Sequence, residues 1–159
     1  RGGVRMDALV LKAPLFGRLQ LLIVTARFAR TLGTLLESGV PLLKALDISR
    51  NLLTNRVLNQ AIETASLRVQ EGGSLAAALK QAAVFPPMLG QLTAAGEKSG
   101  KLEEMLFRVA DTYEHQTELS MTSMLSLLEP LMILLMGGIV GFVVLAILLP
   151  IFEASQGFG

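Results

Sequence analysis

One short run rich in Gly and Lys, Gly96–Lys101 (GEKSGK), looks at first like a phosphate-binding loop. A Walker A loop needs four residues between its glycines and a Ser or Thr directly after the Lys. Here three residues separate Gly96 from Gly100, and Leu102 follows the Lys. Glu97 would also repel a phosphate group. The run therefore predicts a corner between two helices and argues against a nucleotide site.

This corner could instead contact another protein. Glu97 is expected near a helix C-terminus, where the macrodipole disfavours a carboxylate by roughly 0.3–1 kcal/mol. We therefore expect a compensating partner for it, either Lys101 or a group on another subunit. Glu103 and Glu104 follow on the next helix and are read as a solvated or docking face. The candidate partner-contact residues are Glu97, Lys98, Ser99, Gly100 and Glu103.

No combination of side chains supports catalysis or metal binding. His115 is the only histidine and the chain contains no cysteine, so a zinc site and a histidine-dependent triad both lack their parts. We predict that the chain is not an enzyme and uses no cofactor or metal. The N-terminal segment is basic, yet one Tyr, no Trp and no binding motif favour contact with a membrane surface or an acidic partner over nucleic acid.

The elements that carry these residues end in an apolar segment that predicts a membrane span. Residues Leu131–Leu149 are uncharged and apolar on every face, and at 1.5 Å per residue the segment matches a hydrocarbon core of about 30 Å. All 14 Lys and Arg residues lie between Arg1 and Arg108. Because basic residues stay on the cytoplasmic side, the bundle is predicted to be cytoplasmic and the C-terminal tail external.

Four residues in or next to this segment are candidates for membrane-helix packing or for a hinge. Glu129 is the only charged residue in the stretch 119–152. At the headgroup level it would be an ordinary interfacial residue, whereas deeper it would mark a helix contact or a relay. Pro130 removes a backbone hydrogen bond and is expected to bend the helix. Gly137 and Gly141 form a G-x-x-x-G pattern that permits close helix packing.

The remaining sequence predicts an all-α fold, an antiparallel six-helix bundle whose last helix continues into a single transmembrane helix. Helices are expected at residues 16–38, 41–51, 55–71, 75–83, 86–99 and from 101 onward. The expected divisions are a juxtamembrane linker at 1–14, the bundle at 15–128, the transmembrane helix at 129–152 and a periplasmic tail at 153–159. The first residue is Arg and no signal-peptide pattern follows, so we expect a piece of a longer protein.

Several motifs resemble the F-type platform protein family of type II secretion, also called the general secretion pathway protein F family. They are Leu11–Gly17 (LKAPLFG), Ala26–Leu42, Phe85–Met88 (FPPM), Gly96–Leu106, Leu128–Leu131 (LEPL) and Leu149–Phe152 (LPIF). The family typically has two related cytoplasmic helical domains and three membrane spans, and this chain resembles the second domain and the third span. The family's Gly-Glu-x-Ser-Gly corner corresponds to Gly96, Glu97, Ser99 and Gly100. No catalytic residue comes with the resemblance.

The resemblance implies an assembly platform of the bacterial inner membrane, multi-pass in the full-length protein. It would contact the secretion ATPase, other inner-membrane secretion components, pseudopilins, membrane lipid and further copies of itself, but no nucleic acid. The platform protein of type IV pilus assembly shares these motifs, although Ala146–Pro150 (AILLP) favours secretion. A hypothesis of another class is an oligomeric transporter or channel subunit in which Glu129 titrates within a pore.

Overall fold

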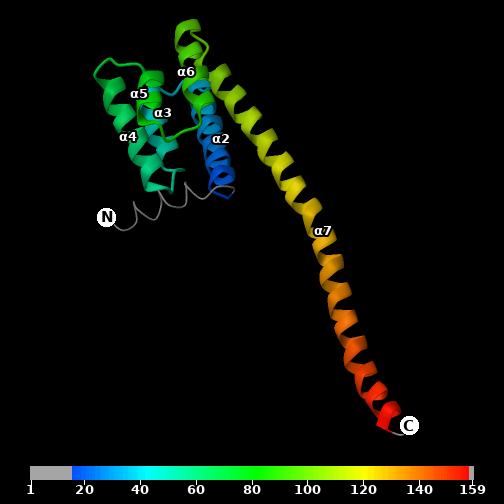
Figure 1. Ribbon diagram of the computed structural model, residues 1–159. Helices are drawn as coiled ribbons and strands as arrows, with labels where there is room; N and C mark the ends of the chain where they lie inside the picture. Colours follow the sequence, from blue (N-terminus) through cyan, green and yellow to red (C-terminus); the bar gives the residue numbers. More distant parts are fainter. Residues whose placement is uncertain (1–15, 158–159) are drawn as a thin grey trace. The chain divides into compact units, whose positions relative to one another are not determined.

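The computed structural model describes residues 16–157, and within that range the chain forms six helices and no strand (Figure 1). The helices are α2 (Phe16–Glu37), α3 (Leu42–Arg50), α4 (Arg56–Gln70), α5 (Leu75–Ala82), α6 (Pro87–Ser99) and α7 (Leu102–Gly157). The all-α bundle predicted from the sequence is confirmed, and the predicted limits of its helices agree to within about a residue. The predicted linker at 1–14 lies outside the described residues.

Side chains and prolines at the helix starts explain where the middle helices begin. The Asn55 side chain accepts hydrogen bonds from the backbone N–H groups of Val57 and Leu58, at 2.9 and 3.3 Å. The Ser74 hydroxyl accepts one from Ala77 at 3.3 Å. Each of these side chains satisfies donors that have no partner inside the first turn of a helix. The helices α3 and α6 instead follow Pro41 and Pro86, neither of which caps by a side-chain hydrogen bond. In α6 the first helical residue is Pro87, whose fixed φ suits the first turn.

Four helices end at residues with positive φ, three of which are glycines. Gly39, Gly72 and Gly100 have φ values of +89°, +94° and +73°, a region that a residue with a Cβ adopts only at a cost. Ala83, at the end of α5, has a φ of +54° and is the only residue other than glycine with positive φ in the described chain. The chain therefore accepts some backbone strain between α5 and α6.

One hydrophobic core lies among α2 to α6 and the first part of α7, and consecutive helices from α2 to α6 pack against one another. The largest fully buried apolar side chains are Phe28, Leu32, Leu46, Leu58, Ile62, Leu75, Leu89, Leu106 and Val109. The rings of Phe28 and Phe85 stack with their centroids 6.1 Å apart. This contact ties α2 to the segment that connects α5 with α6.

The described chain divides after Glu118 into two compact units, and α7 contributes to both. In the first unit, α7 buries Leu106, Val109, Ala110 and Tyr113. Burial raises the pKa of the Tyr113 hydroxyl, and a hydrogen bond with the backbone of Met88 acts in the opposite direction. This bond joins α7 to the first turn of α6, where no side chain caps the helix.

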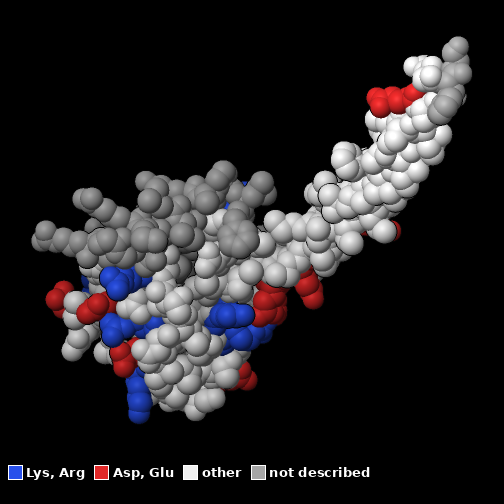
Figure 2. Space-filling view, turned by 90° about the horizontal axis from the view of Figure 1, so that it is seen from below, with Lys and Arg blue, Asp and Glu red and all other residues white. Residues whose placement is uncertain are grey.

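The second unit exposes its apolar side chains on all sides. By length and composition, two described helical segments could cross a membrane, Gly17–Glu37 and Leu102–Gly157. In its most apolar 18-residue stretch the first is one third (33%) buried in the bundle, whereas the corresponding stretch of the second has a mean hydropathy of 2.9 and no buried residue. Figure 2 shows blue and red side chains over the bundle and almost uniformly white atoms along the C-terminal part of α7. The apolar part of α7 therefore has the composition and exposure of a membrane helix.

Candidate functional site

The corner between α6 and α7 has the geometry of a helix C-cap. The backbone N–H groups of Gly100 and Lys101 both donate to the carbonyl of Gly96, the second at 3.0 Å. A Cβ added to Gly96 would lie 2.7 Å from the Cα of Leu102, so α6 and α7 approach too closely for any side chain there. Because these N–H groups are already used, they cannot cradle a phosphate.

Glu97 binds the start of α5. This partner differs from both that were expected from the sequence, Lys101 and a group on another subunit. Its Oε1 accepts hydrogen bonds from the Ser74 hydroxyl at 3.0 Å and from the Ala76 N–H at 2.8 Å. Its Oε2 accepts one from the Leu75 N–H at 3.2 Å. The carboxylate therefore compensates the positive end of the α5 dipole. The sequence offers no signal for this partner, because the first turns of α3, α4 and α6 lack an acidic residue just as that of α5 does.

The other candidate residues of the corner differ in whether the fold already uses their side chains. Lys98 is exposed near the C-terminus of α6, where its charge is favourable for the helix dipole. The Ser99 hydroxyl donates to the Gly96 carbonyl at 3.5 Å, the limit of a hydrogen bond. Glu103 is half-buried in the first turn of α7. Lys98 and Glu103 remain candidate partner contacts because, among the described residues, no hydrogen bond or ion pair that supports the fold uses either side chain.

A cluster of charges joins α2 to α7 and was not recognised from the sequence. The Arg30 guanidinium binds the carboxylates of Asp111 and Glu114, the latter at 2.8 Å, and these bonds raise the pKa of Arg30. The guanidinium carbon also lies 5.8 Å from the centroid of the Phe107 ring. The same ring lies against Gly33, where an added Cβ would approach it to 3.1 Å. From the sequence, Arg30 belongs to the basic N-terminal segment that was expected to contact a membrane surface or an acidic partner. In the structure its charge instead binds two carboxylates of the same bundle.

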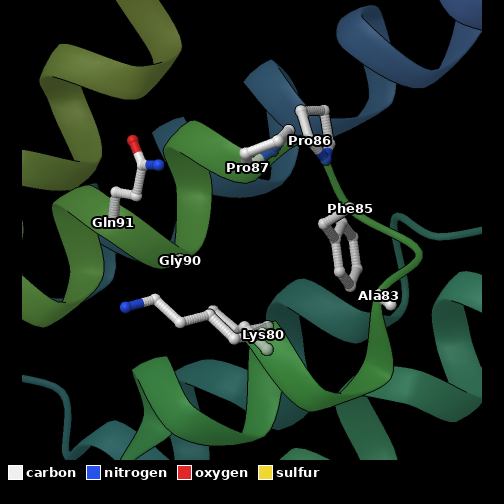
Figure 3. Close-up of a pocket in the computed structure, with 8 residues that line it drawn as sticks. Lys80, Ala83, Phe85, Pro86, Pro87, Gly90 and Gln91 are labelled. Carbon is white, nitrogen blue, oxygen red and sulfur yellow. The ribbon is translucent and has the colours of Figure 1, made fainter.

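A hollow of about 400 Å³ lies between α5 and α6. Figure 3 shows that Lys80 extends along the face of α6 at Gly90, with Phe85, Pro86 and Pro87 on the other side of the hollow. A Cβ on Gly90 would lie 2.8 Å from the Cγ of Lys80, so the missing side chain leaves room for the Lys80 stem. The lining contains no pair of groups suited to acid–base catalysis.

The described residues contain no group of three or more His, Cys, Asp or Glu side chains placed to hold a metal ion. His115 is exposed on α7. The membrane candidates Glu129, Pro130, Gly137 and Gly141 all lie in the exposed part of α7, which continues as a helix through Pro130. A Cβ at Gly137 or Gly141 would meet nothing within 4 Å. Their roles in packing or as a hinge remain predictions.

These features define a helical bundle whose last helix carries a long exposed apolar segment, without a recognisable active site in the described residues. The sequence matches the family model for the type II secretion system (T2SS), protein F, over residues 28–150, and the chain belongs to this family. The family inferred from the motifs is thereby confirmed.

Relatives in this family carry two kinds of name. The chain is 42% identical over 149 residues to the type IV pilus assembly protein PilC of Thermus thermophilus, covering 93% of this chain and 37% of that protein. It is 42% identical over 155 residues to the type II secretion system protein F of Pseudomonas aeruginosa, covering 98% and 38%. For the type II secretion system protein F of Aeromonas hydrophila the identity is 43% over 147 residues, covering 92% and 38%. The chain thus spans 37–38% of the length of these relatives.

Proposed function

We propose that this chain is part of an inner-membrane assembly platform of a type II secretion system. In this role it couples a cytoplasmic secretion ATPase to pseudopilus assembly and protein export. Membership of the protein F family supports the assignment to a secretion machine.

The main support for the proposal is that α7 is part of the bundle at its start and an exposed apolar helix further on. Its first turns bury Leu106, Val109 and Tyr113 in the bundle, whereas its apolar residues from Leu119 onward are exposed. A single helix with these two parts suits a protein that must link a cytoplasmic domain to the membrane. In the proposed topology the bundle is cytoplasmic, residues 129–152 cross the inner membrane and the tail is periplasmic.

A platform in type IV pilus assembly is the second candidate, because the Thermus thermophilus PilC protein is as similar to this chain as the Pseudomonas aeruginosa protein F. Deleting the gene in its own host separates the two functions. The secretion platform predicts that exported proteins accumulate inside the cell while surface pili remain. Loss of pili with normal export would favour the second candidate, and a strain normal in both would refute both.

Contact with the ATPase can be tested at the α6–α7 corner in the full-length protein. A photo-crosslinking residue at Lys98 or Glu103 is expected to capture the ATPase in cells, and the same residue at the exposed Thr64 on α4 serves as the control. Glu103→Lys should reduce the crosslinking at Lys98 while the protein still reaches the membrane in normal amount. Equal capture from all three positions would refute a docking role for this corner.

A further inference from the structure

The hollow between α5 and α6 is apolar at one end and positively charged at the other. Phe85, Pro86 and Pro87 form an apolar wall, and Lys80 is the one charged side chain among the described residues that line the hollow. In Figure 3 the Lys80 ammonium group points away from Phe85, so the charge and the aromatic ring lie apart. The volume of about 400 Å³ is within the range of roughly 300–1,000 Å³ that is typical of ligand pockets.

Lys80 carries a charge for which the bundle supplies no counter-ion. It is the only charged residue between Glu71 and Glu97 in the sequence, and none of the ion pairs within residues 16–157 includes it. Its stem lies directly against α6, because the three atoms nearest to a Cβ on Gly90 would all belong to the Lys80 side chain, the closest at 2.8 Å. The glycine at this position therefore makes room for a lysine whose charge the fold does not use.

The wall of the hollow is fixed by the bundle. The Phe85 ring stacks on Phe28 of the core, with the ring centroids 6.1 Å apart. Ala83, which also lines the hollow, has a φ of +54°, a strained conformation for a residue with a Cβ. Strain of this kind occurs often at binding sites, and a rigid wall lowers the entropy that a ligand loses on binding.

The lining favours a carboxylate over other anions. A phosphate group is usually bound by Arg side chains or by several N–H groups at a helix start. At the start of α6, Pro86 and Pro87 have no N–H, and the N–H of Leu89 donates to the Pro86 carbonyl at 3.2 Å. Surfaces that bind anionic lipid carry clusters of about four to eight basic residues, whereas this hollow has one.

We propose that the α5–α6 hollow binds a peptide segment of another protein in which an aromatic residue stands next to an acidic one. The aromatic ring packs against Phe85 and Pro87, and the carboxylate pairs with Lys80. The hollow lies at the start of α6 and the α6–α7 corner at its end, so the two surfaces are separate. The inference does not depend on whether the chain serves secretion or pilus assembly.

Binding is tested by nuclear magnetic resonance with dipeptide probes and the isotopically labelled whole chain in phosphatidylcholine bicelles. N-acetyl-Phe-Glu-amide at millimolar concentration is expected to shift the amide signals of Ala83 and Gly90, but not that of the exposed Thr64 on α4. N-acetyl-Phe-Gln-amide has the same shape without the charge and should bind about fivefold more weakly. N-acetyl-Ala-Glu-amide lacks the ring and should also bind more weakly.

Three variants test the part that Lys80 plays. Lys80→Met keeps an apolar stem without the charge, so the preference for the Glu probe over the Gln probe should disappear. Lys44→Met removes an exposed lysine of α3 and is the matched control, in which the preference should stay. Gly90→Ala displaces the Lys80 stem without changing any charge and should weaken binding of the Glu probe about fivefold. Circular dichroism should show the same helix content in all three variants.

Three results would overturn the proposal: no shift at Ala83 and Gly90 with the Glu probe at about 10 mM, equal binding of the Glu and Gln probes, or an unchanged preference in Lys80→Met. Shifts at the same amides when phosphatidylglycerol is added without peptide would show that lipid fills the hollow instead. Shifts that grow with protein concentration would show a second copy there. None of these results bears on the export and pilus phenotypes, which test the platform function.

Discussion

Replacing Glu97 by Ala should destabilise the bundle by about 2 kcal/mol, because Glu97 caps the neighbouring helix α5. Loss of an acceptor at a helix start costs about 0.5–2 kcal/mol, and loss of a negative charge there costs a further 0.3–1 kcal/mol or so. The Ser74 hydroxyl, which still accepts a hydrogen bond from Ala77 at 3.3 Å, limits the damage. Glu97→Gln keeps an acceptor oxygen but not the charge, so about half of the loss is expected.

The assay is hydrogen exchange of the chain in detergent micelles, combined with denaturant unfolding followed by far-ultraviolet circular dichroism. The amides of Leu75 and Ala76 donate directly to Glu97, so their exchange should accelerate in Glu97→Ala before that of the core helices. Glu71→Ala is the matched control, because it removes an exposed carboxylate from the end of α4, where the dipole does not favour it. Unchanged exchange at both amides and an unchanged unfolding midpoint would refute the capping role.

Three further predictions use the same unfolding measurement. Arg30→Ala should cost about 1 kcal/mol at low salt and less at high salt, because the side chains in its ion pairs are exposed; an effect independent of salt would contradict this. Thr93→Val should stabilise the bundle by about 1 kcal/mol, since the buried Thr93 hydroxyl has no hydrogen-bond partner in the described chain; a loss of stability would show that it has one. Gly96→Ala should lower the free energy of unfolding by about 2 kcal/mol or more, because the added Cβ would lie 2.7 Å from the Cα of Leu102. Gly141→Ala is the control and should leave the stability of the bundle unchanged. Equal effects of the two variants would refute the close contact.

The helices could be predicted from the sequence because local signals set their ends. Gly39, Gly72 and Gly100 adopt positive φ where helices stop, and Ser74 accepts a hydrogen bond where one starts. Each signal acts within a few residues of its own position. The sequence therefore placed the helix limits without any knowledge of how the helices pack.

The partners of the charged residues could not be predicted in this way. Glu97 reaches residues 21–23 positions earlier because α5 packs beside α6, and Arg30 and Glu114 are 84 positions apart. Hydrophobic periodicity shows which face of a helix is buried but not which neighbouring helix covers it. The partner of Glu97 was consequently left open between Lys101 and another subunit, and Arg30 was grouped with basic residues that contact a membrane surface or an acidic partner. Both charges instead bind groups within the bundle.

The family motif at the α6–α7 corner is explained largely by the requirements of the fold. Gly96 has no room for a Cβ, Gly100 needs a positive φ and Glu97 caps α5. A variant at any of these positions is expected to lose function through lower stability, whatever the protein binds. Partner binding must therefore be sought at side chains for which the fold has no evident use, such as Lys98 and Glu103 at the corner. Loss of function at those positions, in a bundle of unchanged stability, would identify a real contact with another protein.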